Sequence, residues 1–302
     1  MAGPTTSAQR SRAPRGGLMT TLVFGKTGQV AHQLLSLDDM LCLSRLDADL
    51  ANPAACRKKI LEIRPKAVIN AAAYTAVDKA EEEEALAEIV NSDAPKEMAS
   101  ACKELNIPFV HISTDYVFDG AGSKPNSPEG ATLPSGAYGR TKLKGEINIR
   151  NSGAYYAILR TSWVFSAQGK NFVKTMLRSV NKHDTLEVVT DQIGGPTSAR
   201  SIAQTCDRIT KVLLKTDSKS GIYHFCGTPS ISRADFAREI FRQAKKPTIV
   251  TAIKTSHYPT LAKRPLNSRL NCISLKTSFD ISQPDWRDDL TIVLRNLGEI
   301  NS

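Results

Sequence analysis

The stretch that decides the fold is HISTDYVFDG, residues 111–120, which a polar loop connects to AYGRTKLKGE, residues 137–146. Residues 107–113 are apolar and rich in strand-forming side chains, which predicts a buried strand of a parallel sheet. The strand ends in polar side chains at Thr114 and Asp115. In open α/β sheets the carboxyl ends of the strands form the ligand-binding edge, so we expect these two side chains to face a ligand.

The segment after the loop reads as a helix and carries Tyr138 and Lys142 four residues apart. This spacing places both side chains on one helix face, about one turn apart. A phenol, an ammonium and the Thr114 hydroxyl that converge on one spot would form a proton-delivery site. The alternative is an ordinary helical Tyr/Lys pair. The preceding strand and a glycine loop near the N-terminus favour the proton-delivery site.

That glycine loop follows residues 20–24, a short run of strand-forming residues, and precedes an apolar-periodic helix predicted to extend through Leu37. Backbone N–H groups in such a strand–turn–helix unit can hold a pyrophosphate. The spacing is GxxGxxA, and Ala31 can still pack closely against the sheet. We expect the loop to bind a dinucleotide through Gly25, Lys26, Thr27, Gly28, Gln29 and Val30.

Arg45 follows the second predicted strand, residues 40–44, at the position where a dinucleotide fold distinguishes a ribose hydroxyl from a 2′-phosphate. Arginine suits the phosphate, which predicts NADPH. Asp47 and Asp49 follow closely, so NADH is not excluded, and a solvated loop arginine is the equal alternative. At the end of the third strand, Ala71, Ala72 and Ala73 are small enough for a flat nucleotide to lie against the backbone.

Strands and helices alternate from residue 20 to residue 160, as in a Rossmann-type doubly wound α/β fold with a parallel sheet. From about Gly169 the elements become shorter and mixed, which predicts a smaller C-terminal α/β substrate lobe. We therefore expect a disordered extension at residues 1–18, a dinucleotide-binding domain at 19–168 and a substrate lobe within 169–302, with an interleaved boundary.

Composition is ordinary for a globular protein, with 41% hydrophobic and 23% charged residues among 302. No apolar run approaches the roughly 20 residues of a membrane helix, so no membrane association is expected. The six cysteines lack metal-ligand spacing and suggest reduced thiols in a cytoplasmic protein. The net charge of +10 comes from dispersed basic residues, which favours a polyanionic small-molecule ligand over nucleic acid.

Several motifs together resemble the extended short-chain dehydrogenase/reductase family: GKTGQV at 25–30, NAAAYTAVDKAE at 70–81, STDYVFDG at 113–120 and YGRTK at 138–142. Four later blocks narrow the resemblance to reductases of nucleotide sugars: RTSWVF at 160–165, NFVKTML at 171–177, DQIGGPT at 191–197 and RPLNSRLN at 264–271. The resemblance covers nearly all of the chain from residue 20 to about 297.

This resemblance implies NAD(P)H-dependent reduction of the C4 ketone of a dTDP-linked 6-deoxy sugar. Tyr138 is then the proton donor, assisted by Lys142 and Thr114, with Lys142 expected to lower the pKa of the phenol. Further cofactor contacts fall on Asp49 and Leu50. The resemblance and the residue types together give the expected substrate contacts Thr114, Asp115, Trp163, Asn171, Arg264 and Arg269.

Arg264 and Arg269 lie in an irregular basic loop and could clamp a diphosphate, because a guanidinium fork matches phosphate oxygens. The alternative is an ordinary surface loop. The five histidines have no metal-ligand spacing, so no catalytic metal is expected. We expect a monomer or a homodimer.

Two other functions fit the same residues. One is a reductase or epimerase acting on another nucleotide sugar, such as a GDP- or UDP-sugar. The other is a non-catalytic, dinucleotide-binding regulatory subunit. The intact Thr114, Tyr138 and Lys142 argue against the regulatory subunit.

Overall fold

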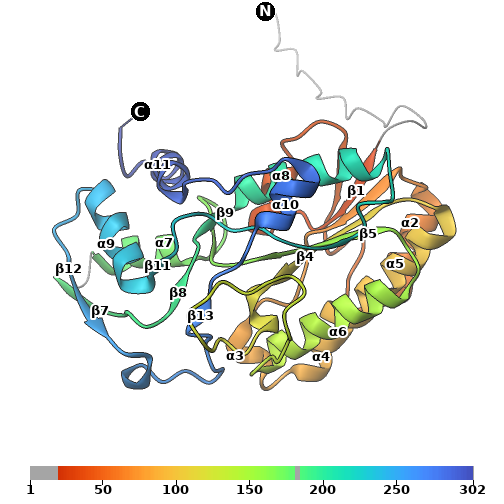
Figure 1. Ribbon diagram of the computed structural model, residues 1–302. Helices are drawn as coiled ribbons and strands as arrows, with labels where there is room; N and C mark the ends of the chain where they lie inside the picture. The colour runs from red at the N-terminus through yellow and green to blue at the C-terminus, as the bar shows by residue number, and fades with distance from the viewer. Residues whose placement is uncertain (1–19, 181–183, 302) are drawn as a thin grey trace, which may run out of the picture.

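The computed structural model describes residues 20–180 and 184–301, so the expected extension at 1–18 lies outside it. The chain forms a parallel sheet with helices on both faces and a smaller lobe beside it (Figure 1). The Rossmann-type α/β prediction is confirmed. No helix within these two ranges has the length and apolar character needed to cross a bilayer.

The central sheet has six strands in the order β10-β5-β4-β3-β1-β2, and every neighbouring pair is parallel. The chain runs from β1 outward to β2 and then returns to the other side of β1 as β3. This reversal creates a crevice at the carboxyl ends of β1 and β3, the usual ligand position in such sheets. The strands are β1 (Thr21–Phe24), β2 (Met40–Leu43), β3 (Ala67–Asn70), β4 (Phe109–Thr114), β5 (Tyr156–Thr161) and β10 (Gly221–His224).

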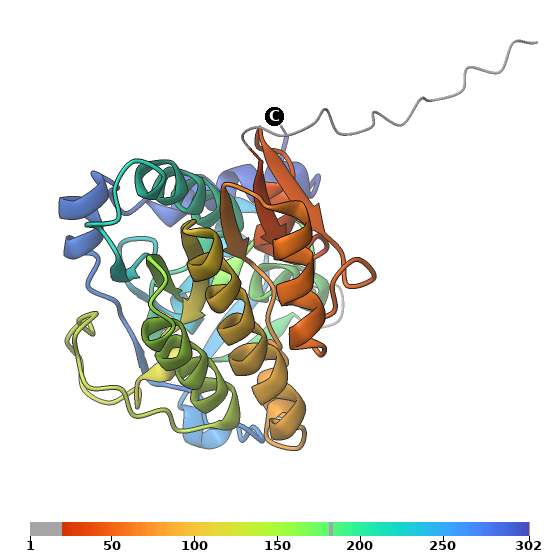
Figure 2. The ribbon, with the colours of Figure 1, turned by 90° about the vertical axis from the view of Figure 1, so that its right-hand side faces the viewer.

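Alternate side chains of the buried strands point to opposite faces of the sheet, and they belong to two apolar cores, one on each face. In β1, Val23 enters one core, while Leu22 and Phe24 enter the other. Figure 2 shows α2 (orange), α5 (gold) and α6 (green) side by side over one face. That face carries α2 (Pro53–Ile63), α5 (Ala94–Leu105) and α6 (Ala137–Asn151), and the other carries α1 (Gln29–Leu34), α8 (Ala199–Leu213) and α10 (Ile273–Phe279).

Local sequence signals explain several helix starts. The Asn52 side chain accepts from the backbone N–H of Ala55 at 3.1 Å, and Pro53 is the first residue of α2, as the N-cap pattern predicts. Helix α1 ends at Leu34, three residues earlier than expected. The Glu81 carboxylate accepts from the backbone N–H of Ala137 at 2.9 Å. Glu81 therefore anchors the start of α6.

Helix α6 lies very close to the π-helical turn η1 (Ile89–Asp93), which joins α4 (Glu84–Glu88) to α5. A Cβ at Gly145 would fall 2.1 Å from the Asn91 carbonyl oxygen, so only glycine permits this approach. The Asn91 side chain also donates to the Thr141 hydroxyl at 3.1 Å. These contacts fix the helix that carries Tyr138 and Lys142. The short α3 (Val77–Ala80) precedes α4.

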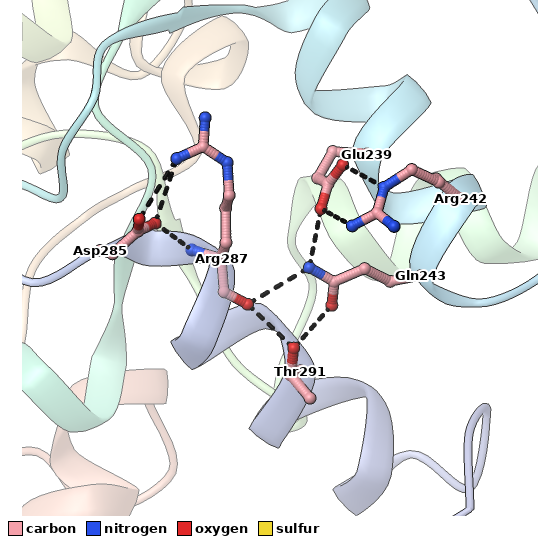
Figure 3. A network of polar contacts seen from close by, with 6 residues as sticks. All are labelled: Glu239, Arg242, Gln243, Asp285, Arg287 and Thr291. Carbon is pink, nitrogen blue, oxygen red and sulfur yellow. Dashed lines mark hydrogen bonds and ion pairs between the residues drawn. The ribbon is translucent and has the colours of Figure 1, made fainter.

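The smaller lobe has its own apolar core, centred on the buried side chains of Phe165, Phe236 and Trp286. Figure 3 shows how two of its helices are joined: Gln243 donates to the Arg287 carbonyl at 3.3 Å and accepts from the Thr291 hydroxyl at 2.9 Å. The lobe contains α7 (Phe172–Val180), α9 (Arg233–Gln243), α11 (Trp286–Asn296) and the parallel pair β7 (Thr185–Val189) and β12 (Ile249–Ile253).

Short strands connect the two halves, and the chain crosses between them repeatedly. After α7 and β7 the chain returns to the main sheet as α8 and β10, and it does so again as α10. The segment after residue 169 thus contributes to both halves. The short strands are β6 (Val164–Phe165), β8 (Ile193–Gly194), β9 (Thr197–Ser198), β11 (Ile231–Ser232) and β13 (Asn267–Ser268), and the 3₁₀ turns are η2 (Asp115–Val117) and η3 (Thr255–His257).

Candidate active site

A cavity of about 1030 Å³ opens at the carboxyl ends of the sheet strands, between the sheet and the smaller lobe. The glycine loop, the end of β2, the end of β3 and the Tyr138/Lys142 face of α6 all border it. All but one of the site residues expected from the sequence line this cavity: Gly25, Lys26, Thr27, Gly28, Gln29, Val30, Arg45, Asp49, Leu50, Ala71, Ala72, Ala73, Thr114, Asp115, Tyr138, Lys142, Trp163, Asn171 and Arg264.

Arg269 is the exception, because it is not among the residues that line the cavity. Its guanidinium donates to the Asn267 side-chain oxygen at 3.0 Å, two residues away. Arg233, the first residue of α9, lines the cavity together with Arg264. Sequence reasoning missed Arg233, since a lone arginine at the start of an amphipathic helix carries no motif.

The glycine loop suits close approach by a phosphate group. Gly25 has φ = 112°, a backbone conformation that residues with a side chain rarely adopt. A Cβ at this position would lie 3.2 Å from Cβ of Ala31. Ala31 is thus the close packing partner that the GxxGxxA pattern predicts. Beyond the loop, Gln29 accepts from the side chains of Ser166 and Asn171, each at 2.9 Å. Asn171 therefore ties the smaller lobe to the glycine loop.

Arg45 stands at the end of β2, exposed to solvent and 2.9 Å from the Asp49 carboxylate. The pKa of Asp49 is lowered, first by a hydrogen bond from the Ala51 backbone and then by Arg45. An exposed ion pair of this kind contributes little to stability. Arg45 is therefore free to exchange this carboxylate for a phosphate at little cost.

Tyr138 lies over the cavity with its ring edge-to-face against Tyr116, at a centroid distance of 5.4 Å. Burial raises the pKa of the Tyr138 phenol, and hydrogen bonding with Thr114 opposes this only partly. Lys142 is not among the groups that shift this pKa. The expected lowering of the phenol pKa by Lys142 is therefore not what the structure shows. Tyr138 keeps its proton at neutral pH, as a proton donor must.

Lys142 is almost fully buried, and its Nζ lies 2.8 Å from the Ile112 carbonyl oxygen and 3.0 Å from Nε2 of His111. Burial lowers the pKa of Lys142 to about 8, against a raising influence of Glu146. The Glu146 carboxylate itself forms a buried ion pair with Arg160 at 2.6 Å. The lysine therefore titrates much closer to neutrality than an exposed lysine does.

Asp115 borders the cavity, and burial raises the pKa of its carboxyl to about 6. One carboxylate oxygen accepts from the Thr114 hydroxyl at 3.2 Å, whereas Oδ2 has no hydrogen-bond partner within the described ranges. A buried acceptor without a partner is costly, so a ligand hydroxyl at this position would be bound favourably.

Trp163 occupies the left-handed region with φ = 50°, an unfavourable conformation for a bulky residue. The Arg233 guanidinium lies over its indole, with Cζ 3.6 Å from the ring centroid, and burial lowers the pKa of Arg233 to about 10. On the same side of the cavity, Arg264 forms an ion pair with Asp78 at 2.5 Å. Two cations and an aromatic face thus border the substrate half of the cavity.

Across residues 20–180 and 184–301, no group of three or more His, Cys, Asp or Glu side chains could hold a metal ion. All six cysteines are buried free thiols.

Comparison with known proteins places the chain in a family. Residues 19–298 match the model of the RmlD substrate binding domain family. The dTDP-4-dehydrorhamnose reductase of Salmonella typhimurium is 40% identical over 282 residues, which cover 89% of this chain and 94% of the relative. The chain belongs to the dTDP-4-dehydrorhamnose reductase family. The expected resemblance to reductases of nucleotide sugars is thereby confirmed.

Solved structures of dTDP-4-dehydrorhamnose reductases have the same fold as this chain. The Clostridium acetobutylicum structure superposes with a TM-score of 0.86 at 36% identity, covering 93% of this chain and all of that one. The Bacillus anthracis structure, a complex with NADP, has a TM-score of 0.85 at 31% identity, covering 92% of this chain and 99% of that one. The family's reductases are NAD(P)H-dependent oxidoreductases.

Proposed function

We propose that this protein reduces the C4 ketone of dTDP-4-dehydro-L-rhamnose to give dTDP-L-rhamnose, with NADPH as the preferred cofactor and NADH as the alternative. The observation that carries the proposal is the shared cavity: the glycine loop, Thr114, Tyr138 and Lys142 all line it. Membership of the dTDP-4-dehydrorhamnose reductase family supports this substrate.

The residues at the dinucleotide end fit NADPH. Gly25 leaves the loop free of a side chain that would block a pyrophosphate, and the small Ala71, Ala72 and Ala73 border the space beside it. Arg45 is available for a 2′-phosphate. When bound, NADPH supplies the hydride for the carbonyl carbon.

Tyr138 acts as the general acid in this proposal. Negative charge develops on the substrate oxygen during reduction, and a positioned donor that protonates this oxygen lowers the barrier. The Tyr138 phenol holds its proton at neutral pH because burial raises its pKa. The Thr114 hydroxyl lies beside it as a second hydrogen-bonding group, and Lys142, one turn further along α6, lines the same cavity.

The substrate half of the cavity holds the rest of the substrate. Asp115 offers a free carboxylate oxygen to a sugar hydroxyl, and Trp163 offers an aromatic face. Arg233 and Arg264 supply the positive charge that a diphosphate requires. Arg269 has no part in this proposal, because it does not border the cavity.

The test is a direct assay with purified protein, NADPH or NADH, and dTDP-4-dehydrorhamnose generated in situ. We expect stoichiometric loss of reduced-nicotinamide absorbance and formation of dTDP-L-rhamnose. Tyr138→Phe should lower kcat by about 10²–10⁴-fold while NADPH still binds. Net turnover only with a GDP- or UDP-sugar, or isomerisation without net oxidation, would overturn the substrate assignment. NADPH binding without turnover on any sugar would indicate a regulatory subunit.

A further inference from the structure

Residues 166–171 form a strap that runs from the end of β6 to the start of α7 and contacts the glycine loop of the other half of the molecule. The anchor of the strap is Gln29, the first residue of α1. Its Oε1 accepts from the Ser166 hydroxyl and from Nδ2 of Asn171, each at 2.9 Å. Both ends of the strap are therefore fastened to one side chain of the dinucleotide half.

The middle of the strap is held against the same helix. Gly169 packs so closely on Gln29 that an added Cβ would lie 3.0 Å from Cγ of that glutamine. One turn further along α1, Nε2 of Gln33 donates to Oε1 of Gln168 at 3.1 Å. The backbone of the strap thus has a fixed position beside the glycine loop along its length.

Lys170 is the one residue of the strap whose side chain takes no part in these contacts. Both of its chain neighbours, Gly169 and Asn171, contact Gln29, so the Lys170 backbone is fixed beside the glycine loop. Its side chain is exposed, lines the cavity and has no carboxylate within ion-pair distance in the described part of the chain. A lysine with a fixed backbone and an unpaired ammonium is well placed to bind an anion in this cavity.

The charges at this end of the cavity favour a phosphate. The glycine loop contributes a second exposed lysine, Lys26, to the lining. The carboxylates among the lining residues are those of Asp49 and Asp115. Asp49 already pairs with Arg45, and Asp115 follows β4, which is two strands away from β1 in the sheet. The positive charge beside the glycine loop is therefore available to a bound anion.

We propose that Lys170 is a cofactor-binding residue supplied by the smaller lobe. Its ammonium neutralises the pyrophosphate of a dinucleotide seated at the glycine loop, and Gln29 and Asn171 are positioning residues that hold it there. The inference rests on the dinucleotide binding of the proposed function, and it adds a contact from the second half of the molecule. A cofactor at the glycine loop thus binds both halves at once.

Fluorescence titration of the full chain with NADPH and with NADH, without any sugar, tests the contact in the absence of turnover. Lys170→Met should raise both dissociation constants by about five- to tenfold, because the pyrophosphate is common to the two cofactors. Lys170→Arg keeps the charge and should bind both cofactors nearly as tightly as the unaltered protein. Lys215→Met is the control, because Lys215 is exposed, follows α8 and does not line the cavity.

The ratio of the two dissociation constants locates the contact. An unchanged ratio in Lys170→Met would support the pyrophosphate, whereas Arg45→Ala should change the ratio through the 2′-phosphate. Dissociation constants equal to those of the Lys215 control, or a loss confined to NADPH, would overturn the inference. If the unaltered protein bound neither cofactor, the dinucleotide site of the proposed function would fail and the inference with it, so the two failures are distinguishable.

Asn171→Ser tests the positioning of Lys170. A serine can still cap α7, as Asn171 does by accepting from the Lys174 backbone N–H, but it lacks the amide that reaches Gln29. We expect NADPH to bind about five- to tenfold more weakly, and Lys170→Met added to Asn171→Ser should cause little further loss. Losses that multiply independently would overturn the positioning role, because Asn171 would then act by a route other than Lys170.

Discussion

The Arg233 guanidinium lies over the indole of Trp163, with 3.6 Å between Cζ and the ring centroid. The pair joins the end of β5 to the start of α9, so it links the two halves of the molecule at the cavity. A half-buried guanidinium over an indole is an anchor that lysine cannot imitate, because an ammonium is not planar.

Arg233→Gln should therefore raise KM for the nucleotide sugar by about tenfold or more, with a smaller effect on kcat, since the lost contact is to bound substrate and to Trp163. Arg233→Lys should have a KM for the nucleotide sugar close to that of Arg233→Gln. Arg242→Gln on the same helix is the control, because Arg242 is exposed and forms its ion pair with Glu239. Steady-state kinetics with varied sugar would contradict the prediction if the Arg233 and Arg242 variants behaved alike.

Arg45→Ala should lower the preference for NADPH over NADH by about tenfold, because a charge-assisted contact to the 2′-phosphate is lost. The rate with NADH should change little. The ratio of kcat/KM for the two cofactors is the measurement. An unchanged ratio would make Arg45 a solvated loop residue.

The buried carboxyl of Asp115 should make the free energy of unfolding depend on pH. Because its folded-state pKa is raised to about 6 from an ordinary 3.8, the folded protein binds more protons than the unfolded chain between these values. Stability should thus fall as pH rises from about 4 to about 6, by up to ~3 kcal/mol from this group. Urea unfolding across this range measures it. In Asp115→Asn the free energy of unfolding should fall less between these pH values, by the contribution of this group. The same pH dependence in both proteins would contradict a raised pKa at Asp115.

Glu146→Gln should destabilise the protein by about 3–5 kcal/mol, because it leaves the Arg160 guanidinium buried without a counter-ion. Both side chains are nearly inaccessible, and Arg160 also contacts the Phe118 ring. Glu88→Gln is a suitable comparison, since the ion pair that Glu88 of α4 forms with Lys144 of α6 is exposed. Equal urea midpoints for the two variants would argue against the buried pair as a source of stability.

Gly145→Ala should lower the free energy of unfolding by about 1–3 kcal/mol, because the new methyl group collides with the Asn91 carbonyl and overpacks the contact between α6 and η1. The control is Gly221→Ala, where the nearest atom would be 3.5 Å away. Thermal unfolding distinguishes them. A loss of activity in Gly145→Ala that exceeds its loss of stability would show that α6 has moved Tyr138.

Much of this site can be predicted from sequence because its members sit at strand ends or on one helix face. The strand ending at Thr114 and the four-residue spacing of Tyr138 and Lys142 define their positions through local geometry alone. Arg233 and Arg269 show the limit. Which basic side chain of the smaller lobe reaches the cavity depends on tertiary packing, and neither residue has a periodic signal that would reveal it.

The expected effect of Lys142 on Tyr138 shows a second limit. Four-residue spacing brings two side chains to one helix face, but it does not say where each polar tip points. Nζ of Lys142 turns toward His111 and the Ile112 carbonyl, and this choice is made by β4, not by α6. Burial, which sets both pKa values, is likewise a property of the assembled sheet.

The repeated crossing between the halves has a consequence for synthesis on the ribosome. The edge strand β10 ends at His224 and α10 ends at Phe279, so the six-stranded sheet and its second helical layer are incomplete until most of the chain has emerged. A fragment that stops at residue 168 would leave the edge of β5 unpaired and would expose the apolar surface beneath α8 to water. Neither half can be produced by simple truncation, and nascent chains stalled before residue 224 would need chaperones to shield that edge.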